Sequence, residues 1–223
     1  MKMLFFKKLI VLLFIALGWV CTSFVSIDDE WVLQKSSPDV LVYSRNLENQ
    51  EVKQLRAVTK IKTSLSSIIA LLNDREACPK WVYKCEKSYI IKKVSDQEYY
   101  SYQNVVAPWP VDNRDIVFNV KISQDPATKV VTHNAMSKPD YISNTKGHIR
   151  VKTFNSIWTL TPLKDGTVIC ENQILVDPGG SLPTWLVNMA AVDGPFETTT
   201  NLRKVVLEEK YQKAQLDYIE EPN

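Results

Sequence analysis

The stretch Ala107 to Ser123 reads APWPVDNRDIVFNVKIS and decides the fold. Trp109 and Pro110 in its first half are typical of a turn. In its second half, apolar side chains recur at every second position: Ile116, Phe118, Val120 and Ile122. A period of two is the signature of a half-buried β-strand, so the stretch predicts a turn that leads into a strand with one face toward a core.

Similar signals on both sides of this strand predict an antiparallel sheet. From Tyr89 onward, turn signals recur at the spacing expected for a meander of about six strands. Lys164 to Gly166 is the clearest hairpin turn. Besides Asp115 to Ser123, the expected strands are Trp31 to Lys35, Val40 to Arg45, Val52 to Lys62, Glu98 to Val106, Lys129 to Met136, His148 to Asn155, Ser156 to Pro162 and Thr167 to Val176.

Two segments have helical periodicity instead. Leu65 to Leu72 carries apolar residues at helical spacing, and Thr63 or Ser64 precedes it as a candidate cap. The second segment follows Pro178, Gly179 and Gly180 and extends to about Tyr218, with an apolar stripe formed by Leu182, Trp185, Leu186, Met189 and Val192. Because Gly194–Pro195 lies inside it, we expect one long C-terminal helix with a bend.

The first 26 residues have the layout of a signal peptide. Three lysines precede an uncharged run, and the small residues Cys21 to Ser23 follow it. We expect residues 1–26 to be a leader and residues 27–223 to form one domain that is periplasmic or secreted. The alternative is an uncleaved anchor, since Leu9 to Ile27 is long enough to span a bilayer of about 30 Å.

Charge and cysteine content argue against several classes of partner. The leader holds three of the 27 basic residues and none of the 25 acidic ones, so the rest of the chain has a formal charge of −1 and we expect no nucleic acid partner. Cys78 and Cys85 are candidates for a disulfide in an oxidising compartment, leaving Cys170 free; three buried thiols are the alternative. Their spacing does not match metal-ligand pairs, and His133 and His148 are the only histidines, so we expect no metal and no cofactor.

Three strings of the sequence resemble one family. APWPVDNRDIVF (Ala107 to Phe118) resembles the signature of the START (StAR-related lipid transfer) domain, in which a Trp-Pro turn leads to an Arg-Asp pair that opens a central strand. GHIRVKTFNSIWTLTPLKDGT (Gly147 to Thr167) and VDPGGSLPTWLVN (Val176 to Asn188) resemble its final strands and the start of its gripping helix. The resemblance extends over Trp31 to Leu216 in family order, and it identifies the chain as a bacterial single-domain member with a signal peptide.

The resemblance implies an α+β helix-grip fold, shared with birch-pollen-allergen-like proteins. In this fold a curved antiparallel sheet wraps around a long C-terminal helix and encloses a hydrophobic cavity for a lipid or sterol. From the strand and helix faces, the candidate cavity residues are Tyr100, Tyr102, Phe118, Val120, Trp158, Leu160, Met189, Val192 and Phe196. The alternative for each of them is ordinary core packing.

The motif residues have a structural and a functional interpretation. We favour a structural role, in turns and local hydrogen bonds, for Trp109, Pro110, Arg114, Asp115, Pro178, Gly179 and Gly180. In the alternative, the guanidinium of Arg114 meets the polar head of a ligand. Some family members use a buried acid and base on adjacent strands, and Ser101 and Val120 stand at these places here. This departure favours a ligand with a hydroxyl or a neutral tail over one that needs a salt bridge.

The predicted function is sequestration or transfer of a lipid, sterol or other apolar ligand without chemistry. The alternative is an enzyme of the same superfamily, similar to its cyclases, and the candidate acids and bases are then His133, His148, Asp115 and Glu171. A third class is a structural or partner-binding module that uses the sheet edge. We favour carriage because no Ser-centred elbow or phosphate-binding glycine loop is present.

The remaining expectations concern partners and ligand exchange. We expect a monomer that contacts a membrane surface transiently. The loop Ser137 to Gly147 and the break at Gly194–Pro195 are expected to form a lid over the cavity, with Trp185 near the membrane.

Overall fold

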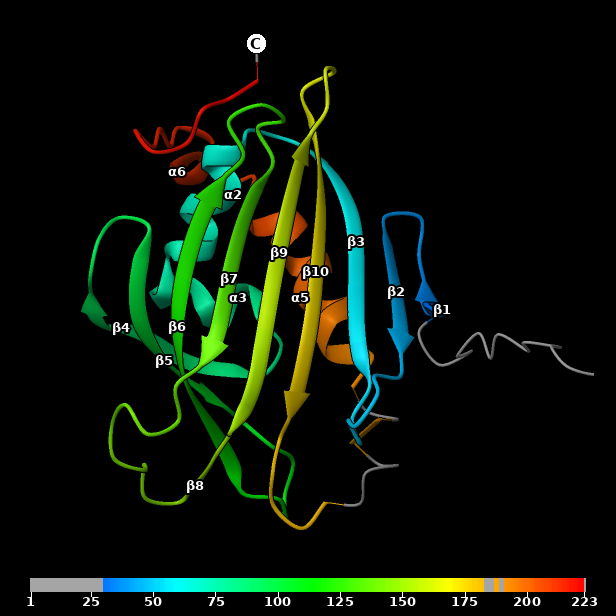
Figure 1. The fold of residues 1–223 in the computed structure, drawn as a ribbon, viewed down its shortest axis with the longest axis vertical. Coiled ribbons are helices and arrows are strands. Elements are labelled where there is room, and N and C mark those ends of the chain that lie inside the picture. Colours follow the sequence, from blue (N-terminus) through cyan, green and yellow to red (C-terminus); the bar gives the residue numbers. More distant parts are fainter. Residues whose placement is uncertain (1–29, 183–186, 189–190, 223) are drawn as a thin grey trace, which may run out of the picture.

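The computed structural model describes residues 30–182, 187–188 and 191–222, which form one large sheet and several helices (Figure 1). The strands are β1 (Val32–Ser36), β2 (Val40–Arg45), β3 (Gln54–Lys62), β4 (Cys85–Lys93), β5 (Glu98–Val105), β6 (Asn113–Gln124), β7 (Val131–Ser137), β8 (His148–Arg150), β9 (Thr153–Pro162) and β10 (Thr167–Asp177). The helices are α2 (Leu65–Asn73), α3 (Cys78–Trp81), α5 (Asp193–Val205) and α6 (Glu209–Gln212), with a short 3-10 helix, η2 (Arg75–Ala77), between α2 and α3.

The sheet has the strand order β1-β2-β3-β10-β9-β7-β6-β5-β4, and β8 pairs with β6 outside this path. All neighbours on the path are antiparallel, which confirms the predicted type of sheet. Three details differ from the prediction. β8 runs parallel to β6. The break between β8 and β9 falls at Val151–Lys152 rather than between Asn155 and Ser156, and β4 already begins at Cys85.

Strand β6 is the best predicted element, and it is buried on both faces. Ile116, Phe118, Val120 and Ile122 all belong to the main hydrophobic core. On the opposite face, Asp115 and Val117 are also fully buried. The alternation of the sequence correctly gave the inward face, and the burial of the other face comes from segments that cover it.

Helix α2 begins where the sequence predicts. The hydroxyl oxygen of Ser64 caps it by accepting the backbone N–H of Ser67 at 3.0 Å. Leu65, Ile68 and Leu72 are buried against the sheet, so the helical spacing of these residues correctly marked one apolar face.

The C-terminal helix is shorter than predicted. Instead of one bent helix to about Tyr218, α5 ends at Val205, and α6 is a single short turn that ends at Gln212. Pro195 does not kink a helix but stands in the first turn of α5. The first backbone N–H groups of a helix have no acceptor within it, so proline is tolerated there. Between Leu182 and Ala191 the structure describes residues 187–188, and both are helical.

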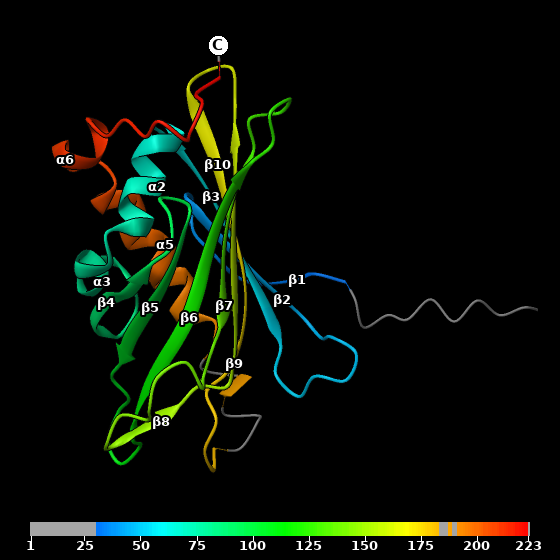
Figure 2. The same ribbon diagram turned by 60° about the vertical axis from the view of Figure 1, so that its left-hand side comes forward.

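The helices lie on one face of the sheet, and β4 and β5 curl toward them (Figure 2). Helix α5 packs against β2 and β3, whereas α3 packs against β4 and α5. The main core lies beneath α2. A second, smaller core joins Val40, Val42 and Ala57 of the sheet to Phe196 of α5 and to Val192 just before this helix. Part of the sheet face between these two packed cores lines a cavity. A cavity in this place is expected for a helix-grip fold.

Candidate ligand-binding cavity

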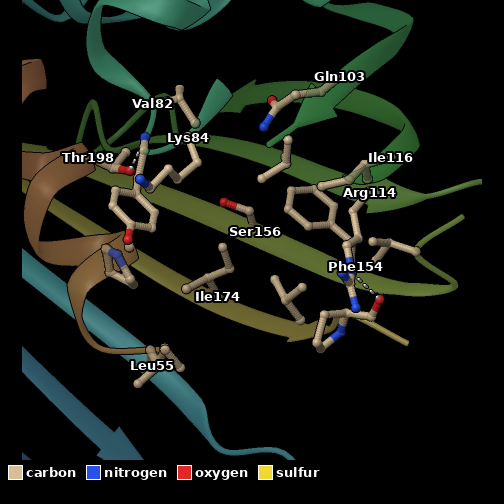
Figure 3. A pocket seen from close by; sticks show the side chains of 18 of the residues that line it. Leu55, Val82, Lys84, Gln103, Arg114, Ile116, Phe154, Ser156, Ile174 and Thr198 are labelled. Atoms are coloured by element: carbon tan, nitrogen blue, oxygen red, sulfur yellow. Dashed lines mark hydrogen bonds between the residues drawn. The ribbon is translucent and has the colours of Figure 1, made fainter. Parts of the chain in front are cut away.

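A cavity of about 730 Å³ lies between the sheet and the helices. Strands β6, β7, β9 and β10 contribute its floor, and the start of α5 contributes one side. Figure 3 shows Arg114 toward one end, Lys84 and Thr198 toward the other, and Ser156 between them. Much of the wall is apolar, as in Leu55, Trp81, Val105, Ile116, Phe118, Ala135, Val151, Phe154, Trp158, Ile174 and Val176.

A buried arginine lies at the inner wall. Arg75 is 8% exposed, and its guanidinium lies 5.2 Å from the centre of the Phe118 ring. It donates hydrogen bonds to Ser88 Oγ at 3.1 Å and to Gln103 Oε1 at 2.9 Å, and a third to the carbonyl of Leu72. Burial lowers the pKa of Arg75. Its described contacts include no carboxylate, so these neutral acceptors and the ring stabilise its charge.

His133 lies near Arg75 and is neutral. Burial, together with the charge of Arg75, lowers the pKa of His133 to about 3. Tyr99 donates its hydroxyl hydrogen to Asn73 Oδ1 at 3.0 Å, so Nε2 of His133, 3.4 Å away, donates to the Tyr99 oxygen. Nδ1 is then an acceptor, and it has no partner among the described residues.

A second polar group interrupts the apolar floor. Ser156 on β9 and Asn172 on β10 line the cavity and are 7% and 4% exposed. The amide nitrogen of Asn172 donates to Ser156 Oγ at 2.9 Å. The two side chains are joined by this hydrogen bond, and the cavity-lining residues opposite them in the sheet, Ala135, Trp158 and Ile174, are apolar.

The rim of the cavity includes two short loops. Val82, Tyr83 and Lys84 come from the loop between α3 and β4, and a disulfide joins Cys78 to Cys85 across this loop, with Cα atoms 6.0 Å apart. The backbone N–H of Tyr83 donates to Thr198 Oγ1 at 3.0 Å, which fixes the loop to α5.

The second rim loop joins β5 to β6. Ala107, Pro108 and Val111 line the cavity, and Trp109 between them is 93% exposed. The loop therefore presents a large aromatic side chain to solvent beside the cavity rim.

Of the two charged motif residues, Arg114 holds turns, whereas Asp115 pairs with the distant Arg150 instead of a local turn. Arg114 lines the cavity, but its guanidinium donates to the carbonyls of Asp112, Pro178 and Gly179. Gly180 has a φ of +80°, and a Cβ there would lie 3.0 Å from Ile149 Cδ1, so the turn beside Arg114 requires glycine.

Asp115 forms a buried ion pair on the opposite face of β6. Its carboxylate oxygens accept two hydrogen bonds from Arg150, each 2.9 Å long. Arg150 also donates to the carbonyls of Pro139, Ile142 and Ser143. The loop 138–147 is therefore fastened to the outer face of the sheet and does not cover the cavity, which corrects the expectation that it forms a lid.

The predicted cavity residues divide into three groups. Phe118 and Trp158 line the cavity. Val120 and Leu160 lie on the same sheet face, but they are fully buried in the main core. Val192 and Phe196 pack in the second core, where Lys35 lies over the Phe196 ring. Met189 lies outside the described residues.

The two tyrosines of β5 point away from the cavity. Gln103 and Val105 line it, so the alternate residues Tyr100 and Tyr102 face outward. Tyr100 stacks on Tyr141, with ring centres 4.0 Å apart. Tyr102 stacks on Tyr89, 5.0 Å away, and its hydroxyl lies 3.3 Å from Thr145 Oγ1.

The sequence analysis missed the polar residues of the cavity: Arg75, Gln103, Ser156 and Asn172. The polar residues of β9 and β10 carried a usable signal, because Ser156 and Asn172 alternate in phase with the apolar Trp158 and Ile174 on their strands. Arg75 carried no such signal, because the short 3-10 helix η2 sets where its side chain points, and the sequence of η2 has no apolar alternation.

The candidate acids and bases are dispersed. His133 lines the cavity, whereas Asp115 pairs with Arg150, His148 Nδ1 lies 3.1 Å from the Lys146 carbonyl, and Glu171 accepts from Gln173. Within the described ranges, no group of three or more potential metal ligands comes together.

Comparison with known proteins shows the family. The START domain profile matches residues 24–210. An uncharacterized protein of Pseudomonas aeruginosa is 33% identical over 175 residues, which cover 78% of this chain and 86% of that protein. The mouse phosphatidylcholine transfer protein is 30% identical over 110 residues, which cover 47% of this chain and 50% of the mouse protein.

A solved structure agrees with the fold and the sequence match. The STAR-related lipid transfer protein of Xanthomonas axonopodis superimposes with a TM-score of 0.74 at 32% identity, covering 80% of this chain and 99% of that one. Together with the profile match over most of the sequence, this similarity shows that the chain belongs to the START domain family.

Proposed function

We propose that this protein binds a lipid or another largely apolar molecule in its cavity and carries or sequesters it without changing it. The observation that carries this proposal is the cavity of about 730 Å³. It falls within the range of roughly 300–1,000 Å³ typical of ligand pockets. Each methylene transferred from water to such a wall stabilises the complex by about 0.8 kcal/mol. Similarity to proteins described as lipid transfer proteins supports the proposal.

The inner wall indicates how such a ligand would be oriented. Arg75 lines the cavity, and the groups around its guanidinium, namely Ser88, Gln103, the Leu72 carbonyl and the Tyr99 hydroxyl, are all neutral. A phosphate or carboxylate head would supply the anion that this buried guanidinium lacks. We therefore place an anionic head against Arg75, which revises the sequence-based preference for a neutral ligand.

The electrostatics of the wall favour carriage over catalysis. The pKa of His133, about 3, makes its imidazole a weak base at neutral pH. The other charged side chains of the described wall are cations, namely Lys53, Arg75, Lys84 and Arg114. Such a wall suits recognition of an oxygen-rich head and offers no strong proton acceptor.

Native mass spectrometry of the purified protein tests the proposal directly. We expect a mass excess that organic extraction releases as an intact lipid, in about one copy per chain. A protein that is empty after gentle purification, and that takes up no lipid from vesicles, contradicts carriage. Conversion of an added lipid into a new product would support the enzymatic alternative.

We also propose transient contact with a membrane through the rim loop that carries Trp109. Trp109 is 93% exposed and Val106 is 39% exposed, beside residues that line the cavity. Tryptophan is favoured at the boundary between lipid and water. The described helices include none that is long and apolar enough to cross a membrane.

Transfer between vesicles tests this contact. Trp109→Ala should slow transfer several-fold while preloaded lipid stays bound, because the variant alters the rim and not the wall. Leu207→Ala is the control, since Leu207 is 57% exposed between α5 and α6. Equal transfer rates for both variants would place the membrane contact elsewhere.

We propose, finally, that the protein is an exported monomer, with residues 1–26 as a leader and residues 27–223 as one domain. The Cys78–Cys85 disulfide supports an oxidising compartment. We expect the native protein to begin near Thr22 to Ile27 and to have the mass of one chain in solution. An intact Met1 on soluble protein would contradict cleavage.

A further inference from the structure

Two polar side chains stand in the apolar floor of the cavity, away from Arg75. Ser156 and Asn172 line the cavity, and both are more than nine-tenths buried. In the sheet, Ser156 lies opposite Ala135 and Ile174, and Asn172 lies opposite Trp158. Apolar neighbours leave these two groups with each other as their main polar contact.

The hydrogen bonds fix the direction of the Asn172 amide. Its nitrogen lies 2.9 Å from Ser156 Oγ and 3.4 Å from the carbonyl oxygen of Ile157. A backbone carbonyl can only accept, so the nitrogen and not the oxygen of the amide must face it. The two amide hydrogens are thereby used, and Oδ1 points to a different side.

This arrangement leaves one donor and one acceptor without a partner in the described chain. Ser156 accepts from Asn172, and its own hydroxyl hydrogen has no acceptor among the described residues. Oδ1 of Asn172 likewise accepts nothing from them. An unmet buried polar group costs about 1–3 kcal/mol, so a ligand that satisfies both groups gains over one that does not.

We propose that Ser156 and Asn172 form a second, neutral recognition site that binds a hydroxyl group on the ligand. The hydroxyl oxygen accepts from Ser156, and its hydrogen is donated to Asn172 Oδ1. A pure hydrocarbon leaves both groups unmet, and an ether or ester satisfies Ser156 alone. A carboxylate is disfavoured because both it and Oδ1 are acceptors. The proposal rests on the proposed ligand-carrying function and adds to it.

A matched pair of probes tests the site. Diphenylhexatriene, a fluorescent hydrocarbon without polar atoms, reports occupancy of the cavity. Cetyl alcohol and its methyl ether then compete with it, because they differ in the hydroxyl hydrogen and one methyl group. We expect the full chain to bind the alcohol about tenfold more tightly, the equivalent of the one hydrogen bond to Asn172 Oδ1 that the ether cannot donate.

Two variants assign the preference to the site. Asn172→Leu should reduce the ratio between alcohol and ether toward one, because Oδ1 is the group that only the alcohol can satisfy. Ser156→Ala should weaken the binding of both the alcohol and the ether and leave their ratio nearly unchanged, because both oxygens accept from Ser156. Both variants should still bind diphenylhexatriene at least as tightly as the unaltered protein, since each removes a polar group that a hydrocarbon leaves unmet. Ser101→Ala is the control, since Ser101 is a buried serine whose hydroxyl donates to the Tyr89 carbonyl at 2.8 Å. Ser101→Ala should show the same ratio between the affinities for alcohol and ether as the unaltered protein. If Asn172→Leu does not fold, the loss of affinity for both competitors in Ser156→Ala decides.

The outcomes separate this site from the function on which it rests. Binding of diphenylhexatriene with no preference for the alcohol overturns the hydroxyl site and leaves carriage intact. A preference that survives in Asn172→Leu, or unchanged affinities for alcohol and ether in Ser156→Ala, also overturns it, since other residues then recognise the hydroxyl. A protein that binds none of the three probes overturns carriage and the hydroxyl site together.

Discussion

Two buried arginines in this structure have opposite surroundings. Arg150 is 8% exposed and forms a two-pronged ion pair with Asp115. Arg75 is equally buried, but the oxygen atoms of Ser88, Leu72 and Gln103 are its partners. A buried charge is costly unless it is paired. Arg150 therefore stabilises the fold, whereas Arg75 is available to pair with an anionic group of a ligand.

Replacement of Arg75 by methionine tests this assignment. Arg75→Met removes a buried charge that has no carboxylate partner, but it also leaves the acceptor oxygens of Leu72 and Gln103 without their donor, so the free energy of unfolding should fall by no more than about 1–3 kcal/mol. The content of lipids with phosphate or carboxylate heads should fall roughly tenfold or more, because hydrogen bonds to charged groups contribute about 1.5–3 kcal/mol. Extraction followed by mass spectrometry measures this content. Lys93→Met serves as the control and should retain lipid, because Lys93 lies outside the cavity wall in an exposed pair with Asp96.

Replacement of Asp115 by asparagine should instead destabilise the fold. Breaking a buried pair on one side costs about 3–5 kcal/mol, because Arg150 remains charged and buried. In the native protein, burial raises the pKa of the Asp115 carboxyl, but the hydrogen bonds and charge of Arg150 outweigh burial and keep the pKa below its ordinary value. A carboxyl with a lowered pKa stabilises the fold above its unfolded pKa of about 4, and this stabilisation is lost as pH falls further.

Urea denaturation at several pH values provides the measurement. The difference between the native protein and Asp115→Asn should be largest at neutral pH and should narrow as the solution becomes acidic. Asp39→Asn is the control, because Asp39 is 64% exposed in its pair with Arg203 and should cost no more than about 1 kcal/mol. A difference that does not change with pH would contradict the role of the ionised pair.

At the scale of elements, the C-terminal tail caps helix α2. The carboxylate of Glu221 accepts the backbone N–H groups of Leu65 at 2.9 Å and Ser66 at 2.8 Å. These groups belong to the first turn of α2, where no carbonyl within the helix can accept them. Negative charge is also favoured at this end of a helix. The tail is therefore part of the fold rather than an appendage.

Removal of this cap should have a measurable cost. Glu221→Ala should lower the free energy of unfolding by about 1 kcal/mol, the usual worth of a helix cap. Glu209→Ala should change it little, because the pair between Glu209 and Lys213 is exposed. Thermal melts of both variants compare the two effects, and equal melting temperatures would show that Glu221 does not stabilise α2.

Elements determined by local sequence were predictable, and those determined by packing were not. The alternation in β6 places Phe118 and Val120 on one face, and both do face inward. The sequence could not tell that Val120 is fully buried in the main core, to which the residues of α2 belong, whereas the cavity reaches Phe118. How far a helix extends over a strand depends on tertiary packing, which has no period in the sequence.

The aromatic strand β5 shows a different limit. Tyr99, Tyr100 and Tyr102 occupy both of its faces, so aromatic content could not choose the inward one. The register between β5 and β6 determines which face points inward. Tyr99 pairs with Val120 and Gln103 pairs with Ile116. Because directly opposed residues share a face of the sheet, Tyr99 and Gln103 point inward with their partners. The same need for partners explains Arg75, whose direction depends on Gln103 and Ser88.

At the scale of the whole molecule, solid and hollow regions lie on one sheet face. Ala135 on β7 is opposite Val120 on β6, yet Ala135 lines the cavity and Val120 does not. Added volume should therefore have different effects at these two neighbouring positions. Close-packed regions resist extra atoms, whereas a cavity accepts them.

A pair of phenylalanine substitutions tests the boundary. Ala135→Phe should reduce the amount of bound lipid while the protein remains nearly as stable, because the ring enters space meant for ligand. Val120→Phe should cost about 1–3 kcal/mol by overpacking. Chemical denaturation and lipid extraction on both variants give the two readouts. A large stability loss at Ala135 with unchanged lipid content would show that this part of the wall is solid core.

The disulfide between Cys78 and Cys85 makes the covalent structure of the cavity rim depend on redox conditions. The loop that it closes carries Val82, Tyr83 and Lys84, which are part of the cavity rim. We therefore expect reduction of this disulfide to loosen the rim and to speed the release of a bound ligand. Under the proposed export, the rim acquires this covalent tie only once the chain reaches an oxidising compartment.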